Sequence, residues 1–279
     1  MCFFATKSSM KIRMKRKLAV VLLICISCHI GWAAQDFVWK SGQNMKVVCD
    51  TTEAPVVKVA LDLLKRDCRS VLSGEISRSE NTGNIYVGTW GESSVQQALA
   101  VTHQLDVAQL NEHKEAFLLN VLPDGRLVVA GSDKRGTAYG VLELSRMMGV
   151  SPWEWWADAV PEKKEEFRLP AGFRKLDYPQ VAYRGIFIND EDWGLTPWSW
   201  KHYEPSERKG QIGPKTHARI FELLLRLRAN TFWPAMHECS IPFFFTEGNK
   251  EMADKYAIYL GTSHCEPMMR NTNGEWKTA

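Results

Sequence analysis

Acidic and imidazole side chains gather where three predicted strands end in the second half of the chain. The strands are predicted over 181–188, 229–235 and 262–268, and the side chains at their ends are Asn189, Asp190, Glu191, Asp192, His237, Glu238, His264 and Glu266. The three consecutive carboxylates at 190–192 repel one another and cannot all be buried. In a (β/α)8 barrel the active site lies at the carboxyl ends of the strands, so this placement favours a catalytic site.

The residues around the acids indicate sugar chemistry. Trp193, Trp198 and Trp200 follow the acids directly. Flat aromatic faces cover the apolar faces of sugar rings, and glycosidic cleavage needs one carboxylic acid and one carboxylate. Asp190 and Glu191 are therefore the first candidates for a carboxylate that acts on water or on the sugar. For each tryptophan taken alone, ordinary core packing is the simpler alternative.

Other chemistries lack part of their sequence pattern. His237 and Glu238 are adjacent, but the second histidine of a His-Glu-x-x-His zinc site is missing. His264 and Glu266 resemble the start of a zinc deaminase pattern, but no Pro-Cys-x-x-Cys segment follows. No glycine-rich loop has the spacing of a dinucleotide or phosphate site. The sequence thus predicts no nucleotide cofactor. It favours His237 as a hydrogen-bonding residue at a sugar site over the alternative that His237 and Glu238 bind a metal.

The first half of the chain predicts a small α/β domain. Strands are predicted over 46–49, 84–88, 115–121 and 126–131, and helices over 54–72, 94–103 and 137–148. The Pro-Asp-Gly turn at 123–125 joins two of these strands as a hairpin, so the sheet is expected to be partly antiparallel. The segment 152–179 carries a tryptophan cluster, a charge run at 162–166 and four prolines. We interpret it as the connection between two domains.

The second half alternates strand and helix, which is typical of a parallel α/β fold. Ile220, Leu223, Leu224 and Leu227 form one apolar stripe of a helix predicted over 216–228, and another helix is predicted over 249–259. Only two and a half strand–helix units fit before the last residue, and such a sheet would leave exposed edges. We therefore expect the N-terminal part of a longer protein, with domains over 34–178 and 179–279, the second being an incomplete (β/α)8 barrel.

The N-terminal segment has the pattern of a secretory signal peptide. A basic region precedes an apolar run at 18–28, and Gly31 and Ala33 occupy the −3 and −1 positions of a cleavage after Ala33. Cleavage after Ala34 is an alternative, and acylation at Cys25 or Cys28 is a weaker one. We therefore predict a signal peptide over 1–33 and an exported, periplasmic or extracellular protein that does not stay in the membrane.

Charge and cysteine content narrow the class further. Six of the 35 Lys and Arg residues precede the apolar run, which leaves 29 against 32 acidic residues and no basic surface typical of nucleic-acid binding. Export permits disulfides, but the sequence does not select a pairing among Cys49, Cys68, Cys239 and Cys265. A domain of this size does not need them, so four reduced thiols are the default expectation.

Long motifs resemble a known enzyme family. The segments that carry the resemblance read YRGIFINDEDWGLTPW at 183–198, LRLRANTFWPAMHE at 225–238 and GSDKRGTAYGVLELSRMMGVSPWEWWAD at 131–158. They resemble glycoside hydrolase family 115, the xylan α-1,2-glucuronidases, and the resemblance covers residues 35–279. It implies a small α/β domain of the kind found as the second domain of hexosaminidases, followed by a (β/α)8 barrel.

The resemblance also implies an activity. Family members release glucuronic acid or its 4-O-methyl ether from glucuronoxylan or its oligosaccharides by inverting hydrolysis, without an organic cofactor, and a homodimer of the full-length enzyme is allowed. By this resemblance Asn189, Asp190 and Glu191 line the site from one strand, His237 and Glu238 join them from the next, and Trp193 flanks the sugar. A uronic acid needs a cationic partner, for which Arg184 is a candidate.

Two alternatives stay open. One is another exo-glycosidase of the same architecture, such as a hexosaminidase-like enzyme acting on an N-acetyl sugar. The other is a truncated product that binds polysaccharide without catalysis, because later barrel strands can carry the general acid.

Overall fold

The computed structural model describes residues 33–93, 107–189, 193–262, 264, 267–270 and 272. In this described part, six strands form a mixed sheet of order β3-β2-β4-β6-β5-β8, in which β3, β2, β4 and β6 are parallel. β5 is antiparallel to both of its neighbours. The strands of this sheet are β2 (Asn44–Cys49), β3 (Glu75–Ser79), β4 (Ile85–Thr89), β5 (Phe117–Val121), β6 (Leu127–Gly131) and β8 (Arg174–Asp177). A separate antiparallel pair joins β1 (Phe37–Lys40) to β7 (Glu166–Leu169).

Two long helices cover one face of the six-stranded sheet. α2 (Pro55–Leu72) begins with a proline, whose missing N–H costs nothing in the first turn, and ends at Ser73 in the left-handed conformation. α5 (Lys134–Met147) begins at Asp133, whose carboxylate accepts from the backbone N–H groups of Arg135 and Gly136. The short helix α4 (Ala108–Glu112) contributes Leu110 to a smaller apolar cluster of other sheet residues.

The second part of the chain forms a three-stranded parallel sheet. β9 (Gly185–Phe187), β10 (Thr231–Trp233) and β11 (Tyr259–Leu260) lie in chain order with β10 in the centre. α7 (Pro214–Arg226) connects β9 to β10, and α8 (Asn249–Lys255) connects β10 to β11. The remaining pieces are short: α6 (Leu195–Trp198), the π-helical turn η1 (Ser199–Tyr203) and the 3-10 turns η2 (Phe243–Phe245) and η3 (Pro267–Met269).

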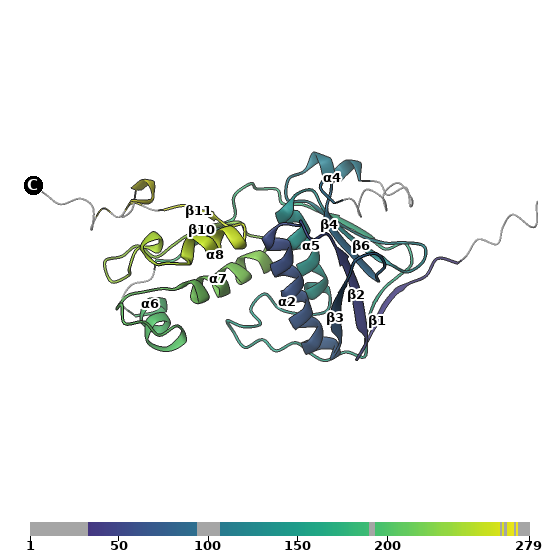
Figure 1. Cartoon of the computed structure of the whole chain (residues 1–279), viewed down its shortest axis with the longest axis horizontal. Helices are drawn as coiled ribbons and strands as arrows, with labels where there is room; N and C mark the ends of the chain where they lie inside the picture. The colour runs from purple at the N-terminus through teal and green to yellow at the C-terminus, as the bar shows by residue number, and fades with distance from the viewer. Residues whose placement is uncertain are drawn as a thin grey trace, which may run out of the picture. The chain divides into compact units, whose positions relative to one another are not determined.

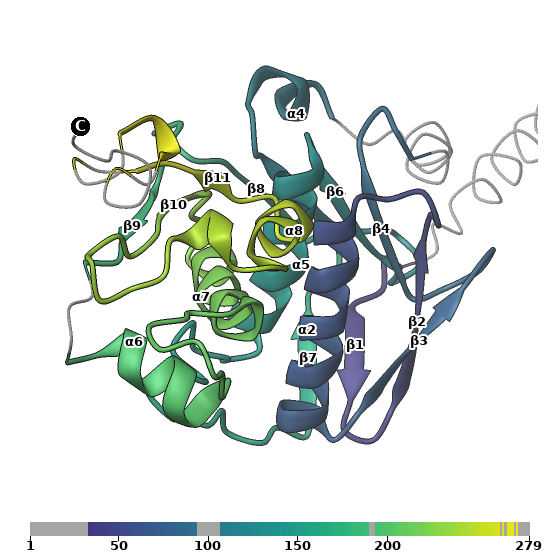
Figure 2. The ribbon, with the colours of Figure 1, turned by 60° about the vertical axis from the view of Figure 1, so that its left-hand side comes forward.

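The helices α2 and α5 lie between the two sheets. Figures 1 and 2 show the six-stranded sheet on one side of this helix pair and α7 and α8 on the other. One continuous apolar cluster includes Leu64 of α2, Tyr139 of α5, Leu224 of α7 and Phe232 of β10. Both parts of the chain therefore share a single core, and the domain boundary at 178/179 stays a prediction.

Most predicted elements are confirmed, with two corrections. The helices predicted over 54–72, 137–148 and 216–228 correspond to α2, α5 and α7, and the predicted hairpin corresponds to β5 and β6. The segment 152–179, interpreted as a connection, instead contributes β7 and β8 to sheets. The third strand of the second half is β11 at 259–260, not 262–268. The helix predicted over 94–103 and the signal peptide over 1–33 lie outside the described residues, apart from Ala33.

A buried cluster of charges joins α2 to α7. Arg226 donates to both carboxylate oxygens of Asp67, at 2.9 and 3.0 Å, and the two side chains are only 4% and 2% exposed. Glu222 accepts from Arg226, Arg66 and Arg219. Burial opposes the ionisation of Glu222, but Arg66 and Arg226 outweigh it and hold the pKa of the carboxyl below its usual value. Arginine side chains pair with both carboxylates of this cluster, so losing one partner would leave a buried charge without its counter-charge.

His217 on α7 lies in an aromatic environment. Its ring is 3% exposed and packs near Phe221, Phe232 and Phe243. Nδ1 is 3.0 Å from the Gly213 carbonyl and 3.2 Å from the Asn249 side-chain oxygen, so it carries the proton that bonds them. Burial lowers the pKa of His217 to about 4. The ring is therefore neutral in the folded protein at neutral pH.

No helix in the described part of the chain is long and apolar enough to cross a membrane. Within the same part, Cys49 and Cys68 are buried free thiols, and the Cys239 thiol lies 3.8 Å from the Ser240 hydroxyl. Cys265 lies outside the described residues.

Asp67→Asn should destabilise the protein by about 3 kcal/mol or more, because it leaves Arg226 buried with half of its charge pairing. Urea unfolding followed by circular dichroism measures this. The matched control is Asp62→Asn on the same helix, where the side chain is exposed; its effect should stay within about 0.5 kcal/mol. Equal stability of the two variants would contradict a structural role for the pair.

The free energy of unfolding should fall as the pH drops from about 6.5, the usual histidine value, toward about 4. In this window the unfolded state binds the His217 proton and the folded state does not. His217→Asn keeps a donor near the Nδ1 position and should remove this pH dependence in urea titrations between pH 6.5 and 5. Glu143, whose pKa is lowered to about 2, also makes the free energy of unfolding fall with pH, but in a range below this window. An unchanged slope in the variant would assign the dependence to other groups.

Candidate functional site

Several predicted site residues lie at one edge of the second sheet. Because β9, β10 and β11 are parallel, their carboxyl ends meet there, and the Ile188 and Gly261 N–H groups extend the ladder to Trp233 and Phe232. Beyond this edge the structure places exposed residues from three connections: Asn189, Trp193, His237, Glu238 and His264. Asp190, Glu191 and Glu266 lie outside the described residues. Trp193 is 91% exposed, so its ring is available to a ligand or a partner surface.

A pocket of about 550 Å³ opens beside Glu238, which is within the size range of small-ligand sites. The residues of one wall come after β9 in the sequence, and those of the other wall come after β10. The lining residues are Thr196, Pro197, Trp200, Lys201, Lys209, Glu238 and Cys239. The pocket thus combines an aromatic side chain, one carboxylate and two ammonium groups.

Sequence reasoning missed Lys201 and Lys209. Both lysines lie in the long segment between β9 and α7, where no periodic pattern singles them out. The one pointer in the sequence was that an acidic substrate needs a cationic residue to bind it. On that ground Arg184 was named as the candidate instead of the two lysines.

The segment that carries Trp200 and Lys201 is tied to the start of α7. The Glu204 carboxylate accepts from the backbone N–H groups of Lys215 and Thr216, which caps the helix. The Ser199 and Thr216 hydroxyls are 2.7 Å apart. These bonds hold the turn η1 at the helix, and so they fix the backbone of Trp200 and Lys201.

The two walls of the pocket are also bonded to each other. The Thr196 and Ser240 hydroxyls form a buried hydrogen bond of 2.8 Å. The Ile241 N–H donates to the Gly210 carbonyl at 2.8 Å. Gly210 has φ +87°, and a Cβ there would lie 2.3 Å from the Cys239 carbonyl oxygen. Only glycine permits this approach, which sets Lys209 next to the Glu238–Cys239 wall.

The tryptophans after the acids divide into different roles. Trp198 stacks on Tyr203 with ring centroids 4.8 Å apart and also meets Trp155 and Trp156 edge-on or tilted. This aromatic cluster is structural packing. Trp200 lines the pocket, and Lys201 Nζ lies 5.1 Å from the centroid of its ring.

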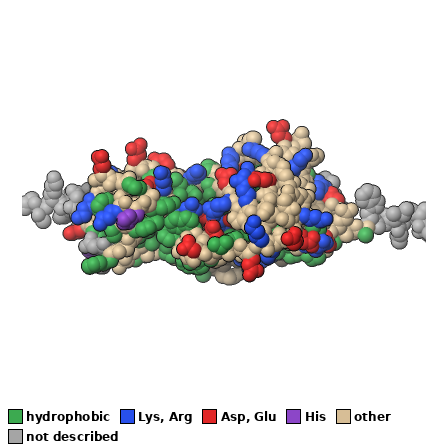
Figure 3. All heavy atoms as spheres, turned by 90° about the horizontal axis from the view of Figure 1, so that it is seen from below, with side chains coloured by type: hydrophobic (Ala, Val, Ile, Leu, Met, Phe, Trp, Pro, Cys, Tyr) green, Lys and Arg blue, Asp and Glu red, His purple; other side chains and the backbone are tan. Residues whose placement is uncertain are grey.

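Seen from below, apolar side chains cover much of the left and middle of the molecular surface (Figure 3).

Arg184 does not lie at this edge, which corrects its interpretation as the partner of a substrate carboxylate. It precedes β9, at the opposite end of the strand from Asn189. Its guanidinium donates to Glu115, to the Tyr139 hydroxyl and to three backbone carbonyls, those of Val181, Ala182 and Arg228. The guanidinium group of Arg184 therefore stabilises contacts between separate segments of this chain.

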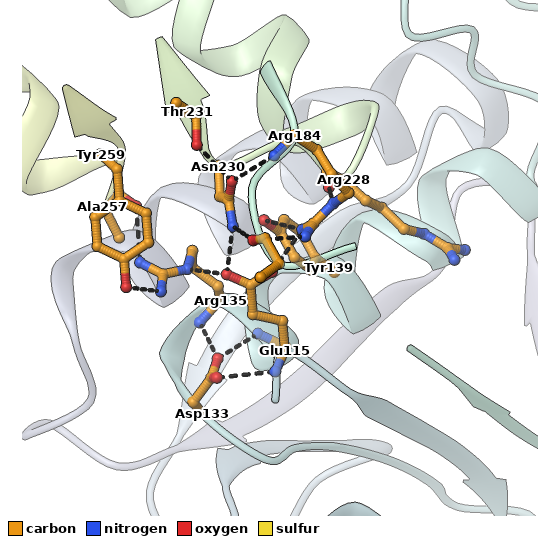
Figure 4. A network of polar contacts seen from close by, with 12 residues as sticks. Glu115, Asp133, Arg135, Tyr139, Arg184, Arg228, Asn230, Thr231, Ala257 and Tyr259 are labelled. Atoms are coloured by element: carbon orange, nitrogen blue, oxygen red, sulfur yellow. Dashed lines mark hydrogen bonds and ion pairs between the residues drawn. The ribbon is translucent and has the colours of Figure 1, made fainter. Parts of the chain in front are cut away.

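Figure 4 shows that Glu115 is the centre of this network. It accepts from Arg184, from Arg135 and from the Asn230 amide, at 2.5, 2.5 and 2.8 Å. Arg135 also donates to the Tyr259 hydroxyl. Burial opposes ionisation of Glu115, but these donors outweigh it and keep its pKa below the usual value. The network joins the amino ends of β9, β10 and β11 to the start of α5, so it is a structural junction.

The pocket and the network differ in how their charges are paired. Within the described residues, no hydrogen bond or ion pair engages the charged groups of Glu238 and Lys209, and Lys201 contacts only the Trp200 ring. The same residues include no group of three or more His, Cys, Asp or Glu side chains that could hold a metal ion. The pocket can therefore offer charge and a flat apolar face to an organic ligand.

A second cavity lies in the first part of the chain. It has about 280 Å³ and is lined by Val47, Cys49, Asp50, Lys58, Leu61, Asp62, Lys65, Ile76 and Arg78. It has no aromatic side chain on which a sugar ring could stack, so the pocket beside Glu238 is the better candidate for a glycan site.

Comparisons with known proteins relate the chain to one glycoside hydrolase family. The family model described as glycosyl hydrolase family 115 matches residues 176–279. A solved structure of a family GH115 4-O-methyl-α-glucuronidase "with specificity for decorated arabinogalactans" shares 61% sequence identity with this chain, with a TM-score of 0.82. The alignment covers 87% of this chain and 32% of that one, so the chain spans about a third of that relative's length.

Other solved structures are far less similar. A chitobiase from Flavobacterium johnsoniae has 12% identity and a TM-score of 0.47, and it aligns over 87% of this chain and 36% of its own. An exo-β-N-acetylglucosaminidase from Vibrio harveyi has 11% identity and a TM-score of 0.45, over 82% and 33%. Neither similarity is high enough to carry an argument. Among curated protein sequences, no match was found.

Gly210→Ala should destabilise the protein more than Gly172→Ala, a matched control with φ +70° but nothing within 4 Å of the added Cβ. Both changes force alanine into a left-handed conformation at a cost of about 1–2 kcal/mol. Only Gly210→Ala also collides with the Cys239 carbonyl, which should add about 1 kcal/mol or more. Urea unfolding of the two variants compares them, and equal losses would show that the wall contact is not needed.

Proposed function

Because the chain belongs to glycosyl hydrolase family 115, we propose that its protein is an α-glucuronidase that removes glucuronic acid or its 4-O-methyl ether from glycan side chains. The observation that carries the proposal is the 61% identity, over 87% of this chain, with a 4-O-methyl-α-glucuronidase. Because the chain spans only 32% of that relative, the activity is proposed for the complete protein rather than for residues 1–279 alone.

The acids after β9 are the proposed catalytic groups. Asp190 or Glu191 would activate water or act on the sugar, and hydrolysis with inversion needs a second carboxyl group about 6.5–9.5 Å away. Asn189, His237, Glu238, His264 and Glu266 would hydrogen-bond the sugar from neighbouring connections, and Trp193 would flank it. The parallel arrangement of β9 and β10 supports this, since it brings Asn189, His237 and Glu238 to one edge.

The proposed architecture is a (β/α)8 barrel of which β9–α7–β10–α8–β11 is the beginning. Ile186 and Phe187 of β9 are each 39% exposed, and a strand inside a larger parallel sheet would bury such side chains. Export through the signal peptide at 1–33 and a homodimer of the full-length enzyme are further parts of the proposal. Cell fractionation and sedimentation of the full-length protein test these two parts.

The polymer that carries the uronic acid is proposed from two sources. The relative's specificity for decorated arabinogalactans favours an arabinogalactan side chain. The resemblance to xylan α-1,2-glucuronidases favours glucuronoxylan. Both polymers belong in the first substrate panel, together with an N-acetylhexosaminide that tests the hexosaminidase-like alternative.

The full-length protein should release uronic acid from at least one of the two polymers. Asp190→Asn or Glu191→Gln should lower kcat by about 10²–10⁴-fold, the size expected when a general acid or base is lost. The control Glu247→Gln changes an exposed acid beyond the pocket lining and should leave the rate unchanged. Reducing-sugar assays with identification of the released monosaccharide measure both.

Two outcomes would contradict the proposal. Release of an N-acetylhexosamine without uronic acid would favour the hexosaminidase-like alternative. Binding of polysaccharide without release of any sugar would favour a binding protein, and the two acids would then have no catalytic role.

A further inference from the structure

We propose that Lys201 and Lys209 form the subsite that recognises the carboxylate of the uronic acid, with Trp200 as the surface under the sugar ring. The inference rests on the proposed function and deepens it, because it assigns the substrate's charge to particular residues. It starts from the pocket beside Glu238, where the two lysines and the tryptophan line the same cavity.

The charges of this pocket are suited to an acidic sugar. Among the lining residues in the described part of the chain, two ammonium groups accompany one carboxylate. In the described part of the chain neither lysine forms an ion pair. The carboxylate of a bound uronate can pair with these ammonium groups, whereas a neutral sugar offers them no charge. Glu238 then faces the hydroxyl side of the sugar, away from its carboxylate.

The geometry brings a cation and a stacking surface together. Lys201 Nζ lies 5.1 Å from the centroid of the Trp200 ring. A pyranose that lies on this ring exposes its apolar C–H face to the aromatic surface. Because Lys201 Nζ lies over this ring, a sugar that packs on the tryptophan beside it brings the carboxylate at its rim within reach of the ammonium group.

The backbone around both lysines is fixed before a ligand arrives. Glu204 and Ser199 hold the Lys201 turn on α7, and Gly210 holds the Lys209 loop against Cys239. Charged groups on fixed backbone lose less freedom on binding than groups on a loose loop. The neighbouring cation Arg208 already donates to the Phe245 carbonyl, and Arg184 belongs to the Glu115 network at the other edge of the sheet.

The test uses the full-length protein and compares glucuronate with glucuronamide, which has the same shape without the charge. Wild-type protein should bind glucuronate more tightly by calorimetry at fixed ionic strength. Lys201→Met and Lys209→Met should each weaken glucuronate binding and raise KM by about tenfold, the size of one charge-assisted hydrogen bond. Glucuronamide binding and kcat should change little. Lys201→Arg keeps the charge and should restore the preference.

The matched control is Lys250→Met, an exposed lysine on α8 outside the pocket lining, which should change neither KM nor the preference. The inference is overturned if the double variant of Lys201 and Lys209 still prefers glucuronate while wild-type protein releases uronic acid. If wild-type protein shows lysine-dependent preference but no hydrolysis, the carboxylate subsite stands and the proposed catalytic function falls. If it shows neither preference nor hydrolysis, both proposals fall.

Discussion

The placement of α7 against α5 and α2 is the interaction on which the rest of this structure depends. α7 lies between β9 and β10 in the chain, and it leads into the start of β10. The buried pair of Arg226 and Asp67 ties the helix to α2, and α7 also packs against α5. At its amino end, the same helix is capped by Glu204 from the segment that carries the pocket. α7 is thus bonded to the first part of the chain through α2, to one wall of the candidate site through Glu204, and it leads into β10, which the other wall follows.

The two edges of the second sheet use charge in opposite ways. At the amino ends of the strands, Glu115 and Arg184 are buried and each has several partners, so they stabilise a junction. At the carboxyl ends, Glu238, Lys201 and Lys209 line an open pocket without ion pairs among the described residues. Buried charges without partners are costly, whereas solvated ones are not. The charged groups of the pocket can therefore stay without ion pairs because water solvates them.

The aromatic residues near the site show how packing and recognition share one segment. Trp198 stacks on Tyr203 and is part of the cluster around Trp155. Its neighbour two residues on, Trp200, faces the pocket. On a helical segment these two positions point in different directions. The buried ring therefore anchors the turn that presents the accessible one.

The sequence by itself determined most of the helices and strands, and also several of the residues at the carboxyl edge of the second sheet. Apolar stripes predicted α2, α5 and α7 to within three residues, because local periodicity decides which face of a helix is buried. The parallel α/β pattern predicted that Asn189, His237 and Glu238 reach one edge, since successive parallel strands end together. The sequence could not predict β7 and β8, whose short polar strands form only because a partner strand is present. Only the tertiary structure brought Lys209 beside Glu238 and gave Arg184 to Glu115, because both outcomes depend on contacts between residues far apart in the chain.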